Sequence, residues 1–164
     1  MQALWIIFVG SVGLISAGTG CAEKPVAVFN VPEQLTLYSI DGREIEARYQ
    51  PMDGETFQGY PVLGKVEVTD AAERKELMAS LEDGIAKSEE DVLDCFWPRH
   101  AMRTTEKGQA IDYVICFECL HLEVHVSGSQ SMKRVTREPR KVFDRHLKAA
   151  QIPLAPLHPA MSEL

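Results

Sequence analysis

The sequence lacks the short motifs that identify the common catalytic folds. It has no GxSxG, HExxH, Walker phosphate loop or GxGxxG, and it contains no internal repeat. It also lacks an excess of positive charge, since 17 Lys and Arg face 24 Asp and Glu and the formal net charge is −7 at pH 7. A net negative charge disfavours general binding to nucleic acid. These absences favour a non-enzymatic protein that does not bind nucleic acid.

Long apolar runs are also scarce, and the main one lies near the N-terminus, from Ala3 to Ala17. This run is too short to cross a bilayer as a helix of the mature protein, but it suits the apolar region of a secretory signal. Small residues and Cys21 follow it, as in bacterial lipoprotein signals, in which the cysteine is lipidated and becomes the first residue. The pattern departs from such signals because no Lys or Arg precedes the run and Gly18 stands where Leu is usual.

We therefore expect residues 1–20 to be a lipoprotein-type signal peptide and Cys21 to carry the lipid. The protein would then be exported and anchored to the membrane at the cell envelope, on the periplasmic side or at the cell surface. The alternative is an ordinary secretory signal, in which case Cys21 has no special role.

Cysteine is rare, with four residues in the chain. If Cys21 is lipidated, the three remaining thiols belong to Cys95, Cys116 and Cys119. An odd number of thiols in an oxidising compartment allows at most one disulfide, so one thiol stays reduced or binds a metal.

The chain after the signal suits a single domain, and an apolar content of 45% is enough for a core. Apolar and alternating stretches predict strands at Leu35–Ile40, Glu44–Tyr49, Pro61–Val68, Cys95–Arg103, Ala110–Cys119 and Leu120–Val126. Helical spacing predicts helices at Ala71–Ala86, capped by Asp70, and at Pro139–Ala150. A polar loop is expected at Gly128–Arg137.

These elements predict an α+β domain over residues 35–153, with a mostly antiparallel sheet and two helices packed on one face. Residues 21–34 would form a tether, and residues 154–164 a flexible tail.

A hairpin between the fourth and fifth of these strands is central to the prediction, because it brings three cysteines together. A turn centred on Lys107 places Cys95 opposite Cys119, and a turn centred half a residue later places Cys95 opposite Leu120. Residues three apart in a strand point to opposite faces, so Cys116 and Cys119 converge only if the strand ends or bulges between them.

Three chemistries would use this cluster. The first is a structural disulfide from Cys95 to Cys116 or Cys119. The second is a zinc site of Cys95, His100, Cys116 and Cys119, because zinc prefers four soft or borderline ligands and CxxC is the usual half-site. The third is a thiol–disulfide redox pair, although thioredoxin-type chemistry needs the CxxC at a helix N-terminus and here it follows a strand. We expect no cofactor, and zinc is the one alternative.

Four further residues are candidates for an anion-binding or polar site. Arg99 follows Pro98, although an arginine beside a strand more often pairs with an acid such as Asp112. His121 and His125 share the polar face of a predicted strand, where such residues are more often ordinary surface.

The segments CFWPRH and ICFEC resemble a pattern of uncharacterised bacterial secreted proteins and lipoproteins, several from planctomycete-like bacteria. The family pattern is C-F-x-P-R-H-G, then G-x-x-x-D, then I-C-F-x-C, and the resemblance covers roughly residues 60–153. The chain matches it at Cys95, Phe96, Pro98, Arg99, His100, Gly108, Asp112, Ile115, Cys116, Phe117 and Cys119. It departs at Ala101, where the family has glycine. The resemblance implies a compact domain built on the cysteine hairpin, and no reaction.

The sequence thus predicts a membrane-anchored envelope lipoprotein with a structural or binding role and a cysteine-stapled hairpin. The alternatives are a zinc-binding domain and a thiol–disulfide redox protein.

Overall fold

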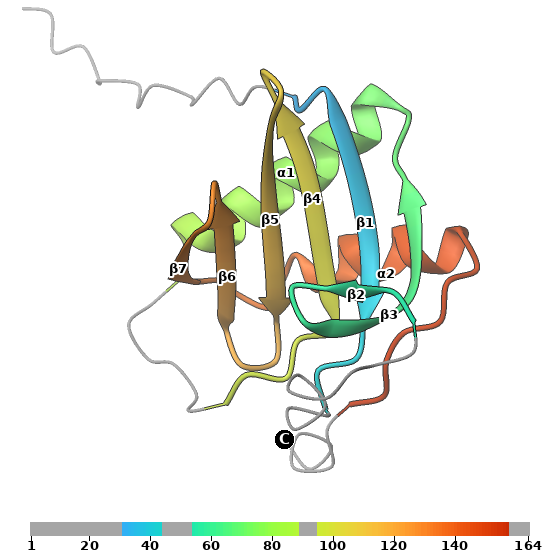
Figure 1. The fold of residues 1–164 in the computed structure, drawn as a ribbon, viewed down its shortest axis with the longest axis vertical. Coiled ribbons are helices and arrows are strands. Elements are labelled where there is room, and N and C mark those ends of the chain that lie inside the picture. The colour runs from blue at the N-terminus through green and yellow to red at the C-terminus, as the bar shows by residue number, and fades with distance from the viewer. Residues whose placement is uncertain (1–30, 44–53, 89–94, 158–164) are drawn as a thin grey trace, which may run out of the picture.

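The computed structural model describes residues 31–43, 54–88 and 95–157 of the 164-residue chain. Seven strands within these residues form an antiparallel sheet in the order β2-β3-β1-β4-β5-β6-β7, accompanied by two helices (Figure 1). Along the chain the elements are β1 (Gln34–Ile40), β2 (Thr56–Phe57), β3 (Tyr60–Glu67), α1 (Ala71–Ala86), β4 (His100–Glu106), β5 (Gln109–Cys116), β6 (His121–Val126), β7 (Ser129–Arg134) and α2 (Arg140–Ala149). The predicted α+β class with a mostly antiparallel sheet is confirmed.

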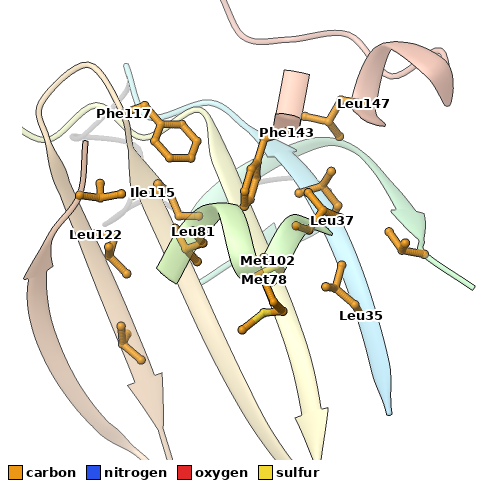
Figure 2. Close-up of a cluster of buried hydrophobic side chains, with 14 residues drawn as sticks. Leu35, Leu37, Met78, Leu81, Met102, Ile115, Phe117, Leu122, Phe143 and Leu147 are labelled. Atoms are coloured by element: carbon orange, nitrogen blue, oxygen red, sulfur yellow. The ribbon is translucent and has the colours of Figure 1, made fainter. Parts of the chain in front are cut away.

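One face of the sheet supplies the main hydrophobic core. Leu37 in β1 is the cross-strand neighbour of Met102 in β4, and paired residues point to the same side of a sheet. Both belong to a buried cluster that also includes Leu81 of α1 and Phe143 of α2. Figure 2 shows these side chains directed toward one another, and Figure 1 shows both helices behind the sheet.

The opposite face is partly covered by the sheet itself, because β3 bends and carries β2 across it. The pairing of β1 with β3 shifts between Ser39 and Ile40, and such a bulge bends a strand. A second buried cluster results, in which the rings of Tyr38 and Phe57 lie 4.4 Å apart. Figure 1 shows β2 in front of the sheet, on the side away from the helices.

Both helices form where the sequence predicts them. The side chain of Asp70 accepts hydrogen bonds from the backbone N–H groups of Ala72 and Glu73, at 2.8 and 3.0 Å, so the predicted N-cap of α1 is confirmed. In α2, Pro139 is the N-cap residue, and the apolar stripe buries Phe143 and Leu147. None of the helices in the described ranges is long and apolar enough to span a bilayer.

Two strand predictions need correction. The first strand of the central hairpin begins at His100 rather than at Cys95, because Pro98 has no N–H to donate to a neighbouring strand. The predicted loop at Gly128–Arg137 contains β7, whose six residues are all exposed, so no alternation of apolar side chains revealed it. The strand predicted at Glu44–Tyr49 lies outside the described residues.

The packed chain also continues past Pro153, where the sequence analysis ended the domain. Ala155 is completely buried, and its carbonyl accepts a hydrogen bond from Nε of Arg99 at 2.5 Å. The beginning of the predicted tail is therefore attached to the segment that enters β4.

We expect Gly84→Ala to destabilise the protein. A Cβ at Gly84 would lie 2.5 Å from Cγ of Pro139 and 3.1 Å from Cγ2 of Val135. Alanine gains about 1 kcal/mol over glycine inside a helix, whereas overpacking costs about 1–3 kcal/mol. Urea unfolding should show a net loss of stability, and Lys75→Ala, at an exposed position of the same helix, should show little change. A stabilised Gly84→Ala protein would contradict this packing.

Candidate functional site

The two cysteine-containing segments meet at the end of the sheet where β4 begins and β5 ends. Pairing of Glu106 with Gln109 makes a two-residue turn between β4 and β5, and this register, if extended, would place Cys95 opposite Leu120. It is the second of the two predicted registers. The ladder stops at the His100–Ile115 pair, so it does not position Cys95. Strand β5 ends at Cys116, and a turn separates it from β6. Because β5 ends before Cys119, the side chains of Cys116 and Cys119 need not point to opposite faces and can lie close together.

The three sulfur atoms gather at this turn. Sγ of Cys95 lies 2.6 Å from Sγ of Cys119, and the backbone N–H of Cys119 donates to Sγ of Cys116 at 3.2 Å. The Cys116 thiol in turn donates to the carbonyl oxygen of Trp97 at 3.4 Å. No S–S bond joins any two of these three described cysteines. Cys116 and Cys119 are buried, whereas Cys95 is partly exposed.

Cys119, which contacts both other cysteines, holds its thiol proton firmly. Its contact with the Cys116 thiol, together with burial, raises the pKa of Cys119 far above the usual range and outweighs the opposing effect of Cys95. Cys119 is therefore a poor nucleophile.

His100 is not brought to the sulfur atoms. It pairs with Ile115 on the helix side of the sheet, while Cys116, the next residue along β5, points to the opposite side. Its Nε2 lies 2.7 Å from Oδ1 of Asp144, and its ring packs edge-on against Phe117 and Phe143. In the described ranges, no group of three or more His, Cys, Asp or Glu side chains is arranged to hold a metal. The zinc site stays a prediction.

Asp144 carries a charge in this partly buried setting. Burial raises the pKa of its carboxyl, but the hydrogen bond and charge of His100, with the charges of Arg140 and Arg99, lower the pKa by more. The net pKa lies below the ordinary aspartate value of 3.8. The carboxylate therefore favours the folded state at neutral pH.

A second charged group lies inside the CFEC turn itself. The Glu118 side chain is 9% exposed, and its Oε1 accepts hydrogen bonds from Nη1 of Arg99 at 3.0 Å and from Nη1 of Arg140 at 3.1 Å. Arg137 adds a bond from Nη2 to the backbone carbonyl of Glu118 at 3.3 Å. Arg99 thus pairs with Glu118, and the suggestion that it pairs with Asp112 is wrong. Sequence analysis missed Glu118, although its place between two cysteines was a usable signal.

The remaining polar candidates lie elsewhere, on the face of the sheet away from the helices. Arg103 binds both carboxylate oxygens of Asp112 at 2.6 Å, and Gln58 of the β2–β3 turn donates a third bond to it at 2.6 Å. His125 is the cross-strand neighbour of Asp112 and contacts Glu123 of its own strand at 3.1 Å. His121 is the cross-strand neighbour of Cys116. The four polar candidates therefore do not form one site.

Neither a family model, nor a curated protein, nor a solved structure matches this chain. The resemblance to a family of secreted proteins and lipoproteins consequently stays a prediction.

Glu118→Gln should destabilise the fold by about 3 kcal/mol, because breaking a buried ion pair leaves its cationic partners without compensation. Denaturant unfolding measures this loss. Glu55→Gln is the matched control, since it removes an ion pair with Lys65 whose side chains are both about half exposed. Equal, small effects of the two substitutions would show that the Glu118 ion pairs are not important for stability.

Asp144→Asn should change how the free energy of unfolding depends on pH. A carboxyl whose folded-state pKa is lowered contributes stability that is present above its unfolded-state pKa and is lost as pH falls through the folded-state value. The stability difference between the native protein and Asp144→Asn should therefore be constant near neutral pH and shrink below about pH 4. Unfolding curves between pH 7 and pH 2 measure it, with the exposed Asp83→Asn as control. A difference that is independent of pH would contradict the lowered pKa.

Proposed function

We propose that the chain is an exported, membrane-anchored envelope protein with a structural or binding role, in which a disulfide joins Cys95 to Cys119. The observation that carries the disulfide is the 2.6 Å approach of the two sulfur atoms. Oxidation would form the S–S bond with loss of two protons and two electrons to a thiol oxidant of the envelope. Cys116, which is buried, would be the thiol that this bond leaves over.

Export and anchoring are supported by the apolar run before Cys21, which lies outside the described residues. An exported protein enters a compartment in which disulfides form and persist. The location and the disulfide therefore support one another.

The proposed disulfide would stabilise the fold because it joins two segments that are distant in sequence. Cys95 precedes β4, and Cys119 belongs to the turn between β5 and β6, so the bond would close a loop between residues 24 apart in sequence. In the chain-entropy model a loop of this size is worth about 3 kcal/mol. The bond would also hold the turn that carries Glu118 against the segment that carries Arg99.

A structural or binding role is supported by the state of the charged candidates. Glu118 and Asp112 each accept hydrogen bonds from an arginine in an ion pair, and Asp144 lies 2.7 Å from Nε2 of His100 and 3.8 Å from Nε of Arg140. Groups engaged in this way hold the fold together and leave little reactivity for acid–base catalysis.

The test uses Cys21→Ser protein, so that no lipid or fourth thiol interferes. After purification in air and denaturation, we expect one reactive thiol and a Cys95–Cys119 disulfide in the peptide map. Reduction should lower the free energy of unfolding by about 3 kcal/mol. Three reactive thiols in metal-free, air-oxidised protein would contradict the disulfide.

Metal analysis of anaerobically purified protein distinguishes the zinc-binding alternative from the proposed disulfide. Zinc in a 1:1 ratio, with the three thiols protected from alkylation, would favour that alternative instead. Turnover of a model disulfide substrate would favour the redox alternative.

A further inference from the structure

Cys116, the cysteine that the proposed disulfide leaves over, lies beside Cys119, one of the two residues that the disulfide would join. Sγ of Cys116 accepts a hydrogen bond from the N–H of Cys119, so its sulfur lies beside the very residue whose own sulfur meets Cys95. Cys119 is thus the middle member of a row of three. The turn between residues 116 and 119 already brings the two ends of the CxxC together.

We propose that the three cysteines form a disulfide-exchange site, in which Cys116 attacks the Cys95–Cys119 disulfide and releases Cys95 as a reactive thiol. This inference rests on the proposed function. The S–S bond between Cys116 and Cys119 forms as the one between Cys95 and Cys119 breaks. The electron pair moves to the Cys95 sulfur, which takes up the proton lost by Cys116, so no external oxidant or reductant is consumed.

The direction of the proposed exchange agrees with the solvent accessibility of the three cysteines. Cys116 and Cys119 are both completely buried, while Cys95 is partly exposed. The exchange therefore moves the disulfide inward and leaves the thiol at the position that a second molecule can reach. A sulfur whose thiol pKa is raised is a poor leaving group, so the raised pKa of Cys119 agrees with release of Cys95 rather than of Cys119.

The substrate class follows from the released group. A thiolate at Cys95 would attack a disulfide of a partner protein or of a small molecule and form a mixed disulfide with it. The buried Cys116–Cys119 bond would stay protected during that step. The site would thus capture disulfide-containing partners at the envelope.

The experiment again uses Cys21→Ser protein, folded and equilibrated in a glutathione redox buffer, quenched with acid and mapped by mass spectrometry. We expect both the Cys95–Cys119 and the Cys116–Cys119 disulfides. Iodoacetamide added to the native protein should alkylate Cys95 and accumulate the Cys116–Cys119 form. A mixed disulfide of glutathione should likewise appear at Cys95.

Removal of the internal nucleophile supplies the control. In Cys116→Ser protein, alkylation at Cys95 should slow by about tenfold or more, because release then requires full reduction. Cys116→Ala is a second variant in case the hydroxyl disturbs the buried position. Mapping of the parent protein tests the proposal even if neither variant folds.

The possible failures are distinguishable. If the Cys95–Cys119 bond is the only disulfide found and Cys95 resists alkylation, the exchange site is refuted while the disulfide stands. If all three cysteines are reduced in air-oxidised protein, the proposed disulfide is refuted as well.

Discussion

The ladder between β4 and β5 extends from the His100–Ile115 pair to the Glu106–Gln109 pair and closes in a two-residue turn. Lys107 and Gly108, the two turn residues, both have positive φ, as the common hairpin turn requires. Because side chains alternate along each strand, a slip of one residue would exchange the two faces of the sheet. The turn geometry therefore determines which residues meet the helices and which meet the β2–β3 hairpin on the other face.

The placement of charge follows from this register. His100 is directed to the helix side and meets Asp144 of α2, whereas Arg103 and Asp112 are cross-strand neighbours on the other face. Arg99, just before β4, meets Glu118 in the turn that follows β5 at the same end of the ladder. The buried carboxylates Asp112 and Glu118 each pair with an arginine, which is the condition for placing a charge inside a protein. Such pairs contribute little net stability, but their removal is costly, so they favour this arrangement of strands and turn over alternatives.

Local signals in the sequence predicted much of the fold. The cap at Asp70 and the apolar spacing after it located α1 correctly, because both act within a few residues of the chain. Strand β1 was identified by its alternation. Strand β7 was missed because it is an exposed edge strand, whose pairing with β6 depends on backbone hydrogen bonds rather than on buried side chains.

The sequence by itself determined that three cysteines would lie near one hairpin and that α1 and α2 would have apolar faces. It left two registers open, and it did not reveal that Glu118 is the partner of Arg99 or that Asp144 is the partner of His100. These pairs join residues 19 and 44 positions apart. Only the tertiary structure decided them, because such contacts depend on how the CFEC turn and α2 pack against the end of the sheet, and no local propensity encodes that packing.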